Sequence, residues 1–126
     1  MIKVLVESPF SAKTKEEFER NKRYARLCLR DCFLRGEAPF ASHLLYTQPG
    51  VLNDAVLEER QLGIDAGLMW GIKDEKSVFY SDFGFSRGME YGLSNAKKSN
   101  RPIEYRNLPS NLMCMLDQTQ FDKWAW

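Results

Sequence analysis

The chain has 126 residues, of which 44% are hydrophobic and 28% are charged, and its formal net charge is +1. This size fits one domain with a real core, and the balanced charge argues against binding of a nucleic acid polymer through its phosphates. No apolar run approaches the roughly 20 residues that span a bilayer, so we expect a cytoplasmic protein that binds no membrane.

The N-terminal part of the chain predicts a strand followed by a long helix. Residues 2–6 alternate β-branched and apolar side chains, which is typical of a buried strand. Thr14 and Glu17 fit a capping box at the start of a helix. The apolar face of that helix continues to Gly36, where the glycine ends it.

The middle of the chain predicts a second strand and a second helix. Residues 38–41 fit a short strand, and residues 42–52 fit a loop because they contain Gln-Pro-Gly. A helix is predicted from a cap at residues 53–54 to about Trp70. Gly63 and Gly67 lie inside it, and their cost to the helix predicts close backbone packing there.

The remaining residues predict two more strands. A strand at 77–80 leads into a helix at 86–98, a fourth strand follows at 102–106, and residues 108–126 form a C-terminal extension. This order predicts a single α/β domain, a flavodoxin-like three-layer sandwich with a mainly parallel four- to five-stranded sheet. Neither a G-x-G-x-x-G nor a P-loop motif is present in the sequence.

The most informative stretch is the link between the third strand and the third helix. It reads D-x-G-x-S-x-G-x-E-x-G from Asp82 to Gly92. Glycines such as Gly84 let a substrate approach the backbone, and a pair of carboxylates (Asp82 and Glu90) suits glycosidic-bond chemistry. The structural alternative is a turn in which Ser86 caps the helix and Asp82 forms an Asx turn.

The pattern resembles the nucleoside 2-deoxyribosyltransferase superfamily, which includes nucleoside 5′-monophosphate N-glycosidases. The resemblance covers residues 2–106 and is carried by Ser8-Pro9-Phe10, Asp82 and Gly88-Met89-Glu90-Tyr91-Gly92. The family often has a tyrosine or another hydroxyl-bearing residue near the end of the first strand, where this chain has Glu7 and Ser8. Residues 1–126 would then form one deoxyribosyltransferase-like domain.

The resemblance implies a role for each matching residue. Glu90 matches the nucleophile that attacks the sugar, and Asp82 matches the acidic position near the leaving base. Residues matching the phosphate and sugar subsites are Ser86, Gly88, Ser8, Phe10 and Ser11. Apart from the resemblance, Arg87 is interpreted either as an additional phosphate ligand or as a side chain that points to solvent. The family needs no cofactor, and its members form homodimers or larger homo-oligomers.

Other polar residues have two interpretations each. His43 and Tyr46 follow the second strand and could stack on or hydrogen-bond a base, or the histidine could hold a loop in place. Residues 58–60 could face the pocket, but we favour a solvated helix face for them. Arg101 is interpreted as a solvated side chain. The cysteines, Cys28, Cys32 and Cys114, lack zinc spacing and are interpreted as reduced core thiols, so no metal is expected.

We therefore expect an enzyme that cleaves the N-glycosidic bond of a (deoxy)nucleoside 5′-monophosphate or nucleoside. The reaction would be hydrolysis or base transfer through a glycosyl-glutamate intermediate. The alternative is a non-catalytic binder or sequestering protein for a nucleotide or an NAD-derived signal, because a fold does not dictate a function.

Overall fold

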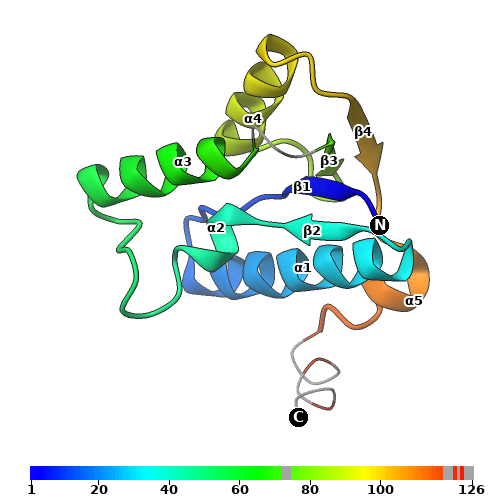
Figure 1. Cartoon of the computed structure of the whole chain (residues 1–126). Coiled ribbons are helices and arrows are strands. Elements are labelled where there is room, and N and C mark those ends of the chain that lie inside the picture. The colour runs from blue at the N-terminus through cyan, green and yellow to red at the C-terminus, as the bar shows by residue number, and fades with distance from the viewer. Residues whose placement is uncertain (72–74, 118–120, 122, 124–126) are drawn as a thin grey trace.

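Four strands form one parallel sheet in the order β2-β1-β3-β4 in the computed structural model of the chain (Figure 1). The structure describes residues 1–71, 75–117, 121 and 123. The strands are β1 (Lys3–Glu7), β2 (Ala38–Phe40), β3 (Lys76–Tyr80) and β4 (Ile103–Arg106). The helices are α1 (Lys15–Leu34), α2 (Ser42–Leu45), α3 (Leu57–Gly71), α4 (Arg87–Lys98) and α5 (Ser110–Met113). The predicted α/β class and the parallel sheet are confirmed.

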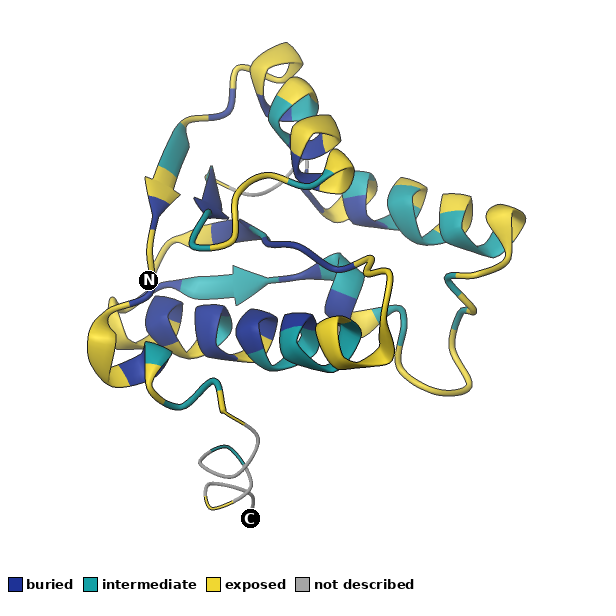
Figure 2. Ribbon diagram, turned by 180° about the vertical axis from the view of Figure 1, so that it is seen from behind, coloured by how far each residue is buried: buried dark blue, intermediate teal, exposed yellow. Residues whose placement is uncertain are grey.

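The two faces of the sheet carry different helices. Val4 and Val6 of β1 point toward α1, where they join the main apolar core with Tyr24 and Cys28. Successive side chains of a strand alternate between faces, so Leu5 and Glu7 point to the opposite face. Gly71 of α3 lies against Leu5, and Gly92 of α4 lies against Glu7. Figure 2 shows the buried inner side of α1 in dark blue.

Local sequence signals set most of the helix ends. Thr14 Oγ1 accepts a hydrogen bond from the Glu17 backbone N–H (3.1 Å), and the α1 helix ends before Gly36, whose φ of 77° suits glycine. Ser86 caps α4 because its Oγ accepts from the Met89 N–H at 3.2 Å. Both predicted caps are confirmed.

Two predictions about the middle of the chain were wrong. Residues 42–45 form the short helix α2 and are not part of a loop. The α3 helix begins at Leu57 and not at the predicted cap. The Asn53 side chain instead accepts a hydrogen bond from the Ala55 N–H at 3.0 Å, which makes a turn ahead of the helix. Asparagine and aspartate favour both a helix cap and a turn of this kind, and the tertiary packing decides which of the two forms.

The cysteines divide between core and surface. Cys28 and Cys32 are buried in the core with free thiols, as predicted. Cys114 is also free but exposed, so its assignment to the core was wrong. Within the part of the chain that the structure describes, none of the helices is long and apolar enough to cross a membrane.

Candidate active site

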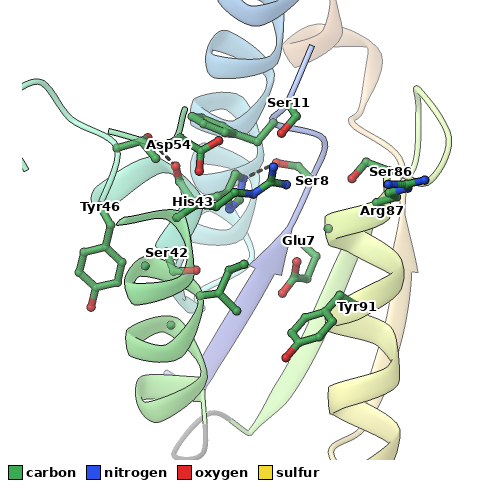
Figure 3. A pocket seen from close by; sticks show the side chains of 18 of the residues that line it. Glu7, Ser8, Ser11, Ser42, His43, Tyr46, Asp54, Ser86, Arg87 and Tyr91 are labelled. Atoms are coloured by element: carbon green, nitrogen blue, oxygen red, sulfur yellow. Dashed lines mark hydrogen bonds between the residues drawn. The ribbon is translucent and has the colours of Figure 1, made fainter. Parts of the chain in front are cut away.

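A cavity of about 560 Å³ opens beyond the carboxyl end of β1, between α3 and α4. This is the edge of a parallel sheet where ligands commonly bind. Figure 3 shows Glu7 and Ser8 at its centre, Ser86 and Arg87 on one side, and His43, Tyr46 and Asp54 on the other. Further lining residues include Phe10, Ser11, Lys13, Ser42, Thr47, Glu59, Arg60, Gly63, Gly67, Gly88, Tyr91 and Gly92.

Glu7, the last residue of β1, supplies the central carboxyl group. Burial raises the pKa of this carboxyl to about 8, and the positive charge of Arg101 opposes part of the rise. Arg101 is buried, not solvated as predicted, because its guanidinium donates to Ser77 Oγ (2.8 Å) and to the Gly71 carbonyl (2.7 Å). Glu7 is therefore mostly protonated at pH 7 and can donate a proton.

The residue after Glu7 forms a polar pair with the histidine. Ser8 Oγ lies 2.9 Å from His43 Nε2, which joins the end of β1 to the start of α2. Burial lowers the pKa of His43 to about 4, so the ring is neutral at pH 7. Phe10 packs edge-on against the same ring, with centroids 5.6 Å apart. The histidine thus lines the cavity and also ties the segment after β1 to α2.

The start of α4 forms the opposite wall. Ser86, Arg87 and Gly88 line the cavity at the N-terminal end of a 12-residue helix. The Arg87 side chain has no hydrogen bond or ion pair within the described residues. Backbone N–H groups and the dipole at a helix start favour an anion, so this end of the cavity suits a phosphate group.

The wall formed by α3 was misjudged from the sequence. Glu59 and Arg60 line the cavity, whereas we expected both on a solvated face. The glycines of α3 explain how the helix comes this close. A Cβ on Gly67 would lie 2.6 Å from Ser42 Oγ, so the predicted close backbone packing is confirmed at Gly67.

The structure divides the predicted site residues into two groups. Those that line the cavity are Ser8, Phe10, Ser11, His43, Tyr46, Ser86, Arg87 and Gly88. Glu90, Asp82 and Gly84 do not line it. Glu90 is exposed on α4. It lies two residues from both Gly88 and Gly92, and residues two apart in a helix do not face the same way.

Asp82 and Gly84 have structural positions in the turn after β3. The Asp82 carboxylate accepts hydrogen bonds from the Tyr24 hydroxyl and from the Leu108 N–H (3.0 Å). Gly84 has a φ of 80°, and its N–H donates to the Ser81 carbonyl. Asp82 therefore joins α1, β3 and the segment after β4 on the other side of the sheet.

The polar lining residues missed from the sequence are Glu7, Lys13, Ser42, Thr47, Asp54 and Tyr91, whereas Glu59 and Arg60 were considered for the pocket but assigned to a solvated face. A signal for Glu7 existed, because it ends the first strand at the edge of the sheet where ligands bind. Asp54 had no comparable signal, since the path of the loop between α2 and α3 places it. Among the described residues, no group of three or more His, Cys, Asp and Glu side chains could hold a metal ion.

Comparisons with known proteins agree with this geometry at the level of the fold. A family model described as "Domain of unknown function (DUF7768)" matches residues 2–106. The curated proteins include no match to the sequence. Among solved structures, a 2-deoxyribosyltransferase from the psychrotolerant bacterium Bacillus psychrosaccharolyticus is similar, with a TM-score of 0.58 and 17% identity. The match covers 86% of this chain and 74% of that one.

Proposed function

This chain belongs to the family described as Domain of unknown function (DUF7768), and we propose that it cleaves the N-glycosidic bond of a nucleoside 5′-monophosphate. The observation that carries the proposal is the Glu7 carboxyl group, which lies at the centre of the cavity and has a pKa of about 8. The fold shared with a 2-deoxyribosyltransferase used for nucleoside synthesis supports a nucleoside-like ligand.

Glu7 replaces Glu90 as the carboxyl group at the centre of the chemistry. The protonated carboxyl of Glu7 donates its proton to the leaving base, which departs with the electrons of the glycosidic bond. Water attacks the anomeric carbon as it becomes cationic, and the Glu7 carboxylate takes the proton that the water loses. Arg101 stabilises this carboxylate while it is ionised. If a second base replaces the water, the same steps transfer the sugar.

The phosphate of the substrate would bind at the start of α4. Ser86, Gly88 and Arg87 supply a hydroxyl, backbone N–H groups and a guanidinium at this end of the cavity. The hydroxyls of Ser8 and Ser11 lie between this end and His43 (Figure 3). We therefore favour monophosphates over free nucleosides as ligands.

A binder without catalysis is the second candidate, and one observation favours it. The glutamate that matches the nucleophile of the deoxyribosyltransferases, Glu90, does not line the cavity. A protein that sequesters a nucleotide or an NAD-derived signal could use the same cavity and leave the glycosidic bond intact. The two candidates differ in one observable, the release of free base.

The test measures release of free base from a panel of nucleosides and 5′-monophosphates by chromatography. We expect Glu7→Gln to lose at least two orders of magnitude of turnover but to keep nucleotide binding, because an amide cannot donate an acidic proton. Turnover of the wild type should fall as the pH rises through about 8, where Glu7 ionises.

Glu90→Gln is the matched control, since the same change is made outside the cavity, and its turnover should equal that of the wild type. Full activity of a folded Glu7→Gln protein contradicts the proposal. A glycosyl ester trapped on Glu7 and detected by mass spectrometry would replace the acid role with a nucleophilic one. Tight nucleotide binding with no base released by the wild type would favour the binder.

A further inference from the structure

A second cavity adjoins the first on the side away from α4. Its volume is about 750 Å³, and it lies over the loop between α2 and α3 and the start of α1. Six residues line both cavities: Ser11, Thr47, Leu52, Asp54, Glu59 and Arg60. The two cavities are therefore one continuous depression, and these residues stand where one passes into the other.

The shared wall carries two carboxylates, Asp54 in the turn ahead of α3 and Glu59 on the first turn of that helix. Glu59 Oε1 accepts a hydrogen bond from the Asn53 N–H (3.1 Å), and Asn53 Oδ1 accepts from the Ala55 N–H (3.0 Å). These bonds set the turn that contains Asp54. In the described part of the chain the Asp54 carboxylate has no hydrogen bond or ion pair of its own, and neither does the Arg60 guanidinium. Both groups are free to meet a ligand.

The order of the residues along the cavity suggests which part of a nucleotide would lie at each end and in the middle. Ser86 and Arg87 lie at one end, Glu7 and Ser8 in the middle, and Asp54 at the far side beyond His43 (Figure 3). A nucleotide with its phosphate at α4 and its glycosidic bond at Glu7 extends its base toward Asp54. The outer edge of that base therefore meets the shared wall.

We propose, resting on the function above, that Asp54 and Glu59 select bases with an exocyclic amino group, namely guanine, cytosine or adenine. Ionised carboxylates only accept hydrogen bonds, so they attract amino groups and repel carbonyl oxygens at the same place. Arg60 donates to the ring nitrogen or carbonyl acceptor on the same edge of the base. The second cavity accommodates the amino group and leaves room beyond it, with Pro49, Val51 and Leu52 as apolar lining.

The test compares nucleotides that differ at one group. Guanosine and inosine 5′-monophosphates differ only in the 2-amino group, and cytidine and uridine 5′-monophosphates differ in amino against carbonyl at C4. Binding is measured by calorimetry on the Glu7→Gln protein, so that no turnover interferes. We expect the amino-bearing member of each pair to bind at least about tenfold more tightly, because a good hydrogen-bonded contact to a base edge provides discrimination of this size.

Asp54→Asn combined with Glu59→Gln on the same background should abolish this preference, because each amide can also donate to a carbonyl. Glu58→Gln is the matched control on an exposed residue outside both cavities, and it should leave the preference unchanged. Equal binding within both pairs overturns the inference, and so does a preference that survives the double substitution. If amino-bearing nucleotides bind more tightly but the wild type releases no free base, the result supports the inference and contradicts the proposed reaction. No binding of any nucleotide contradicts both.

Discussion

Glu7 pairs a cost in stability with the proton-donating role that we propose for it. The pKa of its carboxyl is about 8 in the folded chain, against 4.5 for an ordinary glutamate. Between these values the unfolded chain gives up the proton and the folded chain keeps it. The free energy of unfolding therefore falls as the pH rises from about 4.5 to 8 and levels off above the folded pKa.

We predict that Glu7→Gln stabilises the protein at pH 8 while it removes activity. The amide avoids the cost of a buried ionisable group, which amounts to roughly 2 to 5 kcal/mol for a shift of this size. At pH 4 the wild-type carboxyl is neutral in both states, and the gain should vanish. Urea unfolding at pH 4 and pH 8 measures the difference, with Glu90→Gln as the control. A loss of stability at pH 8 would contradict the raised pKa of Glu7.

The carboxylates of the motif could be identified from the sequence, but the directions in which their side chains point could not. Glu90 and Asp82 were chosen for their spacing after a strand, yet one is exposed and the other bonds to Tyr24. Helical periodicity in α4 could have shown that Glu90 points away from Gly88 and Gly92. Glu7 was visible as the end of a strand. Its protonation could not be read from the sequence, because burial depends on α3 and α4 together.

At the scale of elements, the caps and the succession of strands and helices along the chain were predictable and the connections were not. Thr14, Ser86 and Gly36 act through neighbours within a few residues, so local chemistry fixes them. The α2 helix and the start of α3 depend on contacts between distant segments, such as Gly67 against Ser42. The same long-range packing brings Asp54 and Arg60 into the site.

Gly92 of α4 offers a test of how the sheet and helix position the carboxyl group. A Cβ at this residue would lie 2.7 Å from the Glu7 carboxyl carbon, closer than a Cβ atom approaches a non-bonded heavy atom in proteins. We predict that Gly92→Ala displaces Glu7 and lowers turnover at least tenfold, since a small misplacement of a catalytic group is costly. Alanine stabilises a helix by up to about 1 kcal/mol relative to glycine. A loss of stability in this variant would therefore show that the clash with Glu7 outweighs the gain in helix propensity.

Ser94→Ala is the matched control for that substitution. Ser94 is an exposed residue of the same helix and lines neither cavity. Turnover and melting temperature should both stay near wild-type values in this variant. If Gly92→Ala kept full turnover, the Glu7 carboxyl would not need the position that it occupies against α4, and its role as the acid would be in doubt.

At the scale of the whole molecule, α3 has two apolar faces, and the rest of the chain covers only one of them. Its inner face lines the cavity through Gly63, Ile64 and Gly67. Its outer face carries Leu62, Met69 and Trp70, which are 59%, 68% and 60% exposed. Together with Ala66 they follow the i, i+4, i+7, i+8 spacing of a packing stripe. A helix that is apolar on both faces is normally covered on both.

The aromatic residues of the C-terminal extension (Phe121, Trp124 and Trp126) are also apolar, but the α3 stripe is the better candidate for assembly. Phe121 packs against the core of its own chain, and Arg26 lies over its ring at 5.8 Å. Trp124 and Trp126 lie outside the described residues. A second copy of the chain suits the stripe, because Ala66 between two large side chains lets two α3 helices approach closely in an antiparallel pair.

We predict that the protein sediments as a homodimer and that Leu62→Glu converts it to a monomer. A charge at the centre of an apolar contact between copies is buried without a partner and weakens association. Leu34→Glu is the matched control, since this leucine at the end of α1 is 58% exposed and distant in sequence from the stripe. The monomeric Leu62→Glu variant should also lose turnover, because the opposite face of the same helix carries Arg60 into the cavity. A monomeric wild type with full activity would show that α3 needs no second copy, and the site would then belong to one chain alone.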